Sequence, residues 1–395
     1  MRAIRVETLI VAVLVSGMVA CTAGDDAVTG EPGAPLRGLR AAELARFRAG
    51  QVLFDKVYLP AEGLGPAFNE NQCSACHTVP ASGGTTGFER VVKATRFTKP
   101  ASCDRLGEGG GENIRRQATP LLRGRGVARE SIPHRATEVG RFLSSALFGL
   151  GLVEAISDET ILAAADPDDA DRDGISGRAA RTVDGRLARF GRKGDFATIQ
   201  EFIESALRLE MGLTTPGAPE EPRINGRPVP AGIDPAPDPE IEQSTLHLLT
   251  AFVRFLAAAA PAAPRSAAHA DTLTAGRRLF TEVGCAACHT PAMRTRASGV
   301  LPLDRKWVGL YSDLLLHDMG ARLADVCGHA ASPAEIRTEP LMGLRHRSRF
   351  LHDGRTGDLR EAVLAHGGEG ERSRRTFARL SWLRQHQLLT FLHSL

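Results

Sequence analysis

Hydrophobic residues recur at intervals of three and four positions in two segments of the chain, 248–256 and 388–395. This spacing places the apolar side chains on one face of a helix, so both segments are predicted to be amphipathic helices. Strict alternation of apolar and polar residues, which would indicate half-buried strands, is scarce. We therefore predict a mainly α fold with long loops.

The two predicted helices end two copies of a divergent internal repeat. Each copy opens with a similar run, GQVLF at 50–54 and GRRLF at 276–280. The Ala/Pro-rich segment 257–270 separates the copies and is predicted to be a linker. The pattern predicts an N-terminal domain at 39–256, with a large loop-rich insertion, and a C-terminal domain at 271–395.

A different hydrophobic pattern marks the N-terminus. After Arg2 and Arg5, a run of apolar and small residues, too short to span a membrane, leads to the sequence Met-Val-Ala-Cys. Residues 1–20 are predicted to be a signal peptide, and Cys21 a lipidated cysteine, because this ending resembles a bacterial lipobox. A plain cleaved signal with an incidental Cys21 is the alternative. We expect an exported periplasmic or cell-envelope lipoprotein, attached to the membrane only through lipid on the tether 21–38.

Charge and cysteine usage narrow the class of protein. The 395 residues carry a formal net charge of +3, which gives no argument for a nucleic-acid partner. Of the seven cysteines, Cys103 and Cys327 belong neither to the signal nor to a recognisable motif. In an oxidising compartment these two can form a disulfide. Two unrelated buried thiols are an equal alternative, since the sequence does not show whether their Cα atoms approach.

Two Cys-x-x-Cys-His motifs, at 73–77 and 285–289, give the strongest chemical indication. In such a motif the two thiols add to the vinyl groups of a haem, and the adjacent histidine lies under the iron as its proximal ligand. A helix leading into the motif and a closing helix are typical of a cytochrome c domain, so two cytochrome c-like domains are expected. The predicted attachment and iron-ligating residues of the two covalent c-type haems are Cys73, Cys76, His77, Cys285, Cys288 and His289.

A dithiol redox site and a zinc site are the competing interpretations of these motifs. Thioredoxin-like chemistry expects Cys-x-x-Cys beside a βαβ pattern, which the sequence does not show. Zinc would need a second ligand pair at finger-like spacing. The low aromatic content, 5% of residues, suits a haem protein because a porphyrin itself supplies apolar core.

Several further runs together resemble the di-haem oxidoreductase family, which is related to the bacterial di-haem cytochrome c peroxidases. The resemblance covers roughly residues 40–395. The runs that carry it are GLGPAFN at 63–69, ALFGLGLVEAI at 146–156, DGISGR at 173–178, DLLLHDMG at 313–320, FLHDGR at 350–355 and HGGE at 366–369. The chain departs from the family where tryptophans are expected, with Arg192, Ile336 and Met342 at those positions.

The resemblance implies an enzyme in which the two haems have different roles. One haem would receive electrons from a small donor protein, such as a cytochrome c or a cupredoxin, and the other would reduce hydrogen peroxide. The missing tryptophans put the family's electron route in question. A non-enzymatic di-haem electron carrier is the alternative, as is a haem oxidase or oxygenase acting on an organic or protein substrate.

Two residues are candidates for proton transfer or hydrogen bonding at a peroxidatic haem. Glu154 lies in an otherwise apolar run, where desolvation would raise the pKa of a carboxyl group and suit it to acid–base catalysis. A helix-start or salt-bridge glutamate is the alternative. Gln117, in the insertion, is a weaker candidate for a distal hydrogen-bond donor.

A short acidic loop is a candidate calcium site. Asp169, Asp171 and Asp173, followed by Gly174, match the first half of a calcium-binding loop, although Ala180 stands where the twelfth-position glutamate belongs. A solvated acidic turn is the alternative.

His366 is the preferred candidate for the distal ligand of the second haem. It follows a predicted short helix that stops at a glycine pair, so its side chain is free to reach the iron opposite His289. A helix-terminal histidine favoured by the helix dipole is the alternative. His317 and Met319 are weaker ligand candidates, and Arg355 is expected to pair with a haem propionate.

Overall fold

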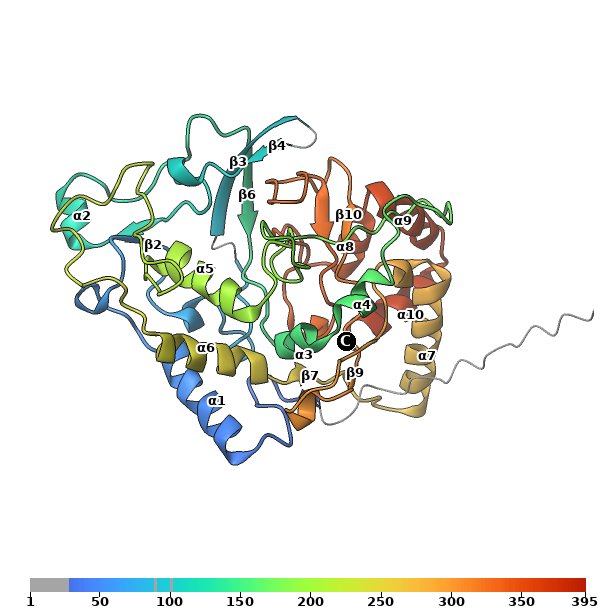
Figure 1. Cartoon of the computed structure of the whole chain (residues 1–395). Helices are drawn as coiled ribbons and strands as arrows, with labels where there is room; N and C mark the ends of the chain where they lie inside the picture. Colours follow the sequence, from blue (N-terminus) through green and yellow to red (C-terminus); the bar gives the residue numbers. More distant parts are fainter. Residues whose placement is uncertain (1–27, 89–90, 100–101) are drawn as a thin grey trace, which may run out of the picture.

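The structure, a computed structural model, describes residues 28–88, 91–99 and 102–395. The predicted signal peptide and the lipidation candidate Cys21 lie outside these residues. Figure 1 shows the longer helices in two groups, with α1 beside α6 in one and α7 beside α10 in the other. In the described part of the chain, no helix is both long and apolar enough to cross a membrane.

The first helix group is built on a close crossing. Helix α1 (Ala41–Phe54) packs along α6 (Gln243–Phe255). The backbones approach most closely at Gly50, where an added Cβ would lie 2.0 Å from the backbone oxygen of Leu248. Two aromatic rings of α1 contact Phe252 beside this crossing. The absence of a side chain at position 50 is therefore what permits this packing.

The second helix group also has a close helix crossing at a glycine. Helix α7 (Ala267–Glu282) packs along α10 (Trp382–Leu392), and an added Cβ at Gly276 would lie 2.2 Å from the backbone oxygen of Gln387. Gly50 and Gly276 are the first residues of the two repeat runs. The repeat thus reflects two equivalent helix crossings.

Two further helices pack on α6, namely α3 (Leu150–Ala155) and α5 (Ile199–Met211). Helix α5 begins with a capping box between Thr198 and Glu201. The other helices are short: α2 (Pro120–Gly124), α4 (Asp158–Leu162), α8 (Leu359–Ala365) and α9 (Glu371–Ala378). Short 3₁₀ turns lie at Pro60–Glu62, Cys73–Ala75, Gly107–Gly109, Cys285–Ala287, Leu301–Leu303, Leu344–His346 and Gly368–Gly370.

Short strands accompany the helices, so the fold is mixed and the predicted mainly α class holds only in part. Strand β3 (Val91–Lys99) pairs antiparallel with β4 (Ser102–Asp104) and β6 (Glu138–Phe142). Most other strands have two or three residues, too few for alternation to be visible in the sequence. They pair as β1 (Thr29–Gly30) with β7 (Ala258–Ala259), β2 (Ala67–Phe68) with β5 (Gln117–Ala118), β8 (Met293–Arg294) with β9 (Trp307–Val308), and β10 (Leu316–Asp318) with β11 (Glu335–Arg337).

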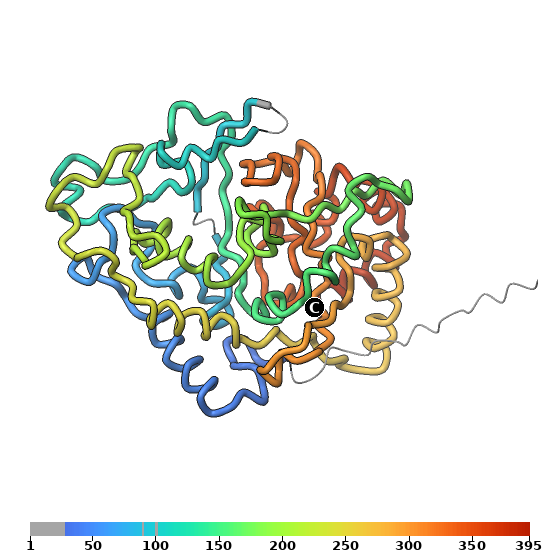
Figure 2. The backbone as a smooth tube through the Cα atoms, in the orientation of Figure 1, coloured from blue at the N-terminus to red at the C-terminus, as the bar shows by residue number. Residues whose placement is uncertain are grey.

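Buried side chains connect the two halves of the chain. The larger hydrophobic cluster surrounds α1, α3, α5 and α6, and it also includes Leu310, Leu315 and Met342 from the C-terminal half. A second cluster lies among α7, α8, α9 and α10. Figure 2 shows the green part of the tube, after α3, crossing to the orange and red half. The first helix group therefore packs against loops and short strands of the C-terminal half, while α7 and α10 have a core of their own.

A disulfide between Cys103 and Cys327 decides between the two alternatives left by the sequence. The Cα atoms of the two cysteines are 5.9 Å apart, within the range that a disulfide requires. Cys103 lies in β4, and Cys327 lies in the loop between β10 and β11. The bond therefore attaches the three-stranded sheet to the C-terminal half of the chain.

Removing this disulfide is expected to destabilise the protein. Cys103→Ser with Cys327→Ser should lower the free energy of unfolding by roughly 2–5 kcal/mol, because the bond closes a long loop and restricts the unfolded chain. Thermal or denaturant unfolding of the oxidised parent and the double variant measures this. Equal midpoints for the two proteins would show that the bond does not stabilise the fold.

Candidate haem sites

The first Cys-x-x-Cys-His motif forms a tight turn at the edge of a cavity. The segment Cys73–Ala75 is a 3₁₀ turn, and Cys73, Cys76 and His77 line the cavity. The Nδ1 of His77 donates to the backbone oxygen of Gly84, 3.0 Å away. This bond orients the ring and holds the proton of the neutral imidazole on Nδ1, so that the lone pair is on Nε2. Burial lowers the pKa of His77 and favours the neutral imidazole, the form that binds metals.

The second motif has the same local construction. Cys285–Ala287 is again a 3₁₀ turn, and the Nδ1 of His289 donates to the backbone oxygen of Tyr311, 3.0 Å away. Burial, together with the nearby His366, lowers the pKa of His289 to about 4. Both motif histidines are therefore neutral, with Nδ1 engaged and Nε2 available.

The thiols of the motifs argue against a dithiol redox site. Burial raises the pKa of Cys73 and of Cys285 to about 12. Reactive redox cysteines instead have a depressed thiol pKa.

The cavity at the first motif has the chemistry that a porphyrin requires. Its volume is about 270 Å³, and much of its lining is apolar. Arg192, Arg337 and Arg347 bring positive charge to the lining, as carboxylate groups of a ligand would need. Arg347 Nε, which also lines the cavity, is buried without a hydrogen-bond partner among the described residues. The apolar lining residues include Phe54, Leu147, Phe148, Val153, Phe190, Phe202 and Val253.

The second motif faces a second histidine. Helix α8 begins at Asp358, whose side chain accepts from two backbone N–H groups, and it ends at Ala365, just before His366. The Nδ1 of His366 donates to the backbone oxygen of Ala362, 2.9 Å away, which leaves Nε2 free. The charge of His366 contributes to the lowered pKa of His289, so the two side chains interact electrostatically.

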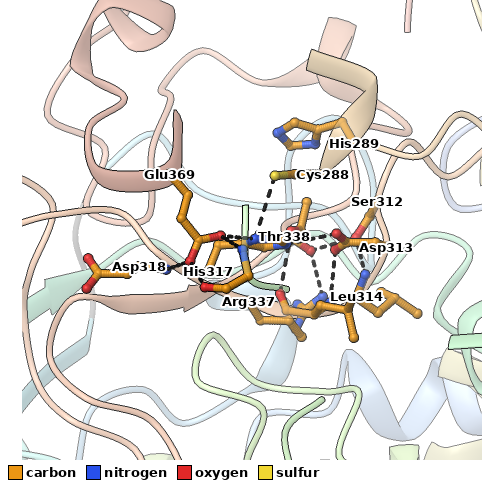
Figure 3. A network of polar contacts seen from close by, with 12 residues as sticks. Cys288, His289, Ser312, Asp313, Leu314, His317, Asp318, Arg337, Thr338 and Glu369 are labelled. Carbon is orange, nitrogen blue, oxygen red and sulfur yellow. Dashed lines mark hydrogen bonds and ion pairs between the residues drawn. The ribbon is translucent and has the colours of Figure 1, made fainter. Parts of the chain in front are cut away.

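His317 is not available as an iron ligand, because both of its ring nitrogens are engaged (Figure 3). Its Nε2 lies 2.8 Å from a carboxylate oxygen of Asp313, and its Nδ1 lies 2.6 Å from one of Glu369. Burial opposes protonation, but hydrogen bonds to Asp313, Cys288 and Glu369 prevail and raise the pKa of His317 to about 12. Both ring nitrogens of His317 are thus held by carboxylates, and neither is presented to an iron as the ligand prediction requires.

Glu369 joins two of the runs that carry the family resemblance. Besides His317, its carboxylate accepts from the backbone N–H of Ser176 at 3.0 Å, the Ser176 hydroxyl at 2.8 Å and the backbone N–H of Asp318 at 3.1 Å. These contacts attach the loop containing Ser176 to the second haem site. Met319 also lies here, since an added Cβ at Gly370 would be 3.3 Å from Met319 Cε.

Glu154 and Gln117 do not line the cavity, in contrast to their predicted role beside a haem. The carboxylate of Glu154 accepts from the backbone N–H of Ile199, at the start of α5, and pairs with Arg254 at 2.6 Å. This is the helix-start and salt-bridge alternative. Gln117 Nε2 donates to the backbone oxygen of Asn69 at 2.6 Å. Both side chains thus make structural contacts with other segments of the chain.

In the acidic loop, the carboxylates that lie close together differ in one member from the predicted set. Oxygens of Asp166, Asp169 and Asp171 lie within 4.8 Å of one another. Asp173 instead accepts from the backbone N–H of Ile175 at 2.8 Å. A cation at this loop would therefore use Asp166 in addition to two of the three predicted residues.

Arg355 is engaged within its own turn. Its guanidinium pairs with Asp353 at 2.6 Å and donates to the backbone oxygen of Arg322 at 2.8 Å. Arg355 is not among the described residues that line the first cavity, whereas Arg192 and Met342, which replace expected tryptophans, do line it.

One acidic residue of the first cavity was missed by sequence reasoning. Glu210, in the last turn of α5, lines the cavity and accepts a hydrogen bond from Asn69 Nδ2 at 2.7 Å. Asn69 is the last residue of the GLGPAFN run. A buried asparagine in that run was the available indication, but its partner lies 141 residues away.

Comparison with known proteins identifies the family of the chain. Residues 133–395 match the family model described as "di-haem oxidoreductase, putative peroxidase". The match covers more than half of the 395 residues, so the chain belongs to this di-haem oxidoreductase family. It is by family an oxidoreductase that uses haem. No curated protein matches the chain.

Two solved structures show weaker likeness. The hydrazine synthase of Kuenenia stuttgartiensis is 12% identical, with all of both chains covered and a TM-score of 0.45. A MauG-like protein associated with microbial copper homeostasis is 16% identical over 64% of this chain and 88% of its own, with a TM-score of 0.28. These values are too low to carry an argument.

Proposed function

We propose that the chain is an exported di-haem c-type cytochrome with peroxidase-like activity. One haem would be attached through Cys73 and Cys76, and the other through Cys285 and Cys288. The observation that carries the proposal is the matched construction of the two motifs, in which each buried, neutral histidine keeps Nδ1 on a backbone oxygen and Nε2 free. Haem bound there would supply a redox-active iron.

The two sites differ in a way that suggests their roles. His77 is the sole histidine among the described residues that line the first cavity. At the second site, His366 presents a free Nε2 near His289. We propose that His366 is the second axial ligand of the second site, and that the first site stays open to substrate. Met319 is the next candidate.

The proposed reaction reduces hydrogen peroxide. Each H₂O₂ takes up two electrons and two protons and gives two molecules of water. A small electron-donor protein, such as a cytochrome c or a cupredoxin, would supply the electrons. We further propose that Cys21 carries a lipid and holds the protein in the periplasm or at the cell envelope.

A steady-state assay of the holoprotein with hydrogen peroxide and a panel of reduced donors tests this function. We expect donor oxidation that depends on peroxide, and a high-spin signal from one haem of the half-reduced protein. Two low-spin haems that do not react with peroxide would instead make the protein an electron carrier.

We also propose that the loop of Asp166, Asp169 and Asp171 binds calcium. Because the folded chain would bind the ion and the unfolded chain would not, chelation should lower the melting temperature. The variant Asp171→Asn should no longer respond to the chelator. Glu221→Gln, in a separate acidic cluster with Asp234 and Glu240, should respond as the parent does. A melting curve that chelation leaves unchanged, with no metal by elemental analysis, would count against the site.

A further inference from the structure

We propose that Glu210 is the acid–base residue of the first haem site, with Asn113 as the hydrogen-bond donor beside it. This assignment rests on the proposed peroxidase-like function. Glu210 would take the proton from one oxygen of H₂O₂ and deliver it to the other, which leaves as water when the O–O bond breaks. The remaining oxygen becomes the second water with two electrons from the donor and two protons from solvent, so Glu210 is regenerated.

The position of Glu210 is fixed by two contacts to one residue. Its carboxylate accepts from Asn69 Nδ2 at 2.7 Å, and its backbone oxygen accepts from the backbone N–H of Asn69 at 2.7 Å. Asn69 is 1% exposed. The carboxyl group therefore lines the cavity in one orientation, which proton transfer to a small substrate requires.

Asn113 is the hydrogen-bond donor beside Glu210. It is 4% exposed and lines the same cavity as His77 and Glu210. Its Oδ1 accepts from Asn69 Nδ2 at 2.9 Å. Its buried Nδ2 lies beside the carboxylate of Glu210 and lowers the pKa of that carboxyl group. An amide nitrogen carries two N–H donors, so one remains for an oxygen of a bound substrate.

The surroundings of Glu210 suit a carboxyl group that exchanges protons. Burial raises its pKa, and the hydrogen bonds from Asn69 and Asn113 and the positive charge of Lys93 and Arg116 oppose that rise only in part. A general acid–base works best when its pKa approaches the working pH.

Two other carboxylates that line the cavity are paired with arginines. Glu70 forms an ion pair with Arg116, and Glu112 forms one with Arg105 at 3.3 Å. The positions of these two carboxylates are set by their arginine partners, whereas Glu210 is held by a neutral amide.

The test compares Glu210→Gln with Glu154→Gln in the holoprotein. Both variants replace a glutamate of the same half of the chain by the same amide, but only Glu210 lines the cavity. Peroxide turnover should fall by about 10²–10⁴ in Glu210→Gln and stay near that of the parent in Glu154→Gln. Haem content and the resting spectrum should be unchanged in both variants.

Cyanide binding gives a second readout that does not depend on turnover. Hydrogen cyanide must lose its proton when it binds as the anion, so a distal base accelerates binding. Glu210→Gln should slow cyanide association at least tenfold and abolish its dependence on pH in the acidic range, while Glu154→Gln should keep both properties.

The outcomes separate this assignment from the proposed function. Parent-like cyanide kinetics and parent-like turnover in Glu210→Gln would overturn the role of Glu210. A parent protein without peroxide turnover, whose cyanide binding still depends on Glu210, would overturn the peroxidase function and retain the acid–base assignment. If Glu210→Gln does not retain haem, Glu210→Asp is measured instead. It keeps the carboxylate but withdraws it by one methylene, so unchanged cyanide kinetics would overturn the proposal.

Discussion

His366→Gly should convert one of the two haems of the holoprotein from low spin to high spin and leave the other unchanged. The expectation follows from the geometry at the end of α8, where a backbone hydrogen bond orients the His366 ring and leaves Nε2 free near His289. Removing the imidazole would remove the sixth ligand. Two imidazole ligands generally give a lower potential than a His/Met pair, so the parent haem should be a weak oxidant.

Visible and electron paramagnetic resonance spectra of the purified variant measure this change. His393→Gly is the matched control, because His393 also follows the last turn of a helix, α10, but its side chain is exposed. It should retain the parent spectrum. If both haems keep their parent low-spin signals in His366→Gly, the assignment passes to Met319, since His317 has both ring nitrogens engaged.

Replacing Cys285 and Cys288 together by alanine should halve the covalently bound haem. Each haem would be held by its own pair of sulfurs, so loss of one pair leaves the other attachment intact. The porphyrin would also fill apolar space beside the core of α7 and α10, so the variant should unfold at a lower temperature than the parent.

Haem staining on a denaturing gel and intact-protein mass measure the attachment. The double variant Cys103→Ser with Cys327→Ser removes the same number of cysteines and should keep both haems, because these residues form the disulfide. An unchanged haem content after loss of Cys285 and Cys288 would mean that the second motif does not attach haem.

The sequence predicted those elements of the fold that are determined by residues close together in the chain. The periodic segments 248–256 and 388–395 lie mostly within α6 and α10, because an apolar face at helical spacing is visible in one stretch of sequence. The repeat was visible because Gly50 and Gly276 each allow the close approach of two helix backbones. The three-stranded sheet of the insertion was missed, since its strands carry little alternation.

Features that depend on distant partners were not predictable in this way. The carboxylate of Glu154 meets Arg254, 100 residues away, and this contact turned a catalytic candidate into a structural residue. The carboxylate of Glu210 accepts a hydrogen bond from Asn69, and that of Glu369 accepts one from Ser176, 193 residues away in the sequence. A sequence pattern identifies the residue types that a site needs, but folding decides which of them meet.

The central claim, that two haems are covalently attached to the chain, is tested most directly by acid–acetone extraction followed by a pyridine haemochrome assay of the precipitated protein. Because each of the two Cys-x-x-Cys-His motifs would form thioether bonds, the porphyrin should stay with the protein, and the assay should return about two haems per chain. Haem that moves into the organic phase, or a chain that holds zinc in place of haem, would contradict the account.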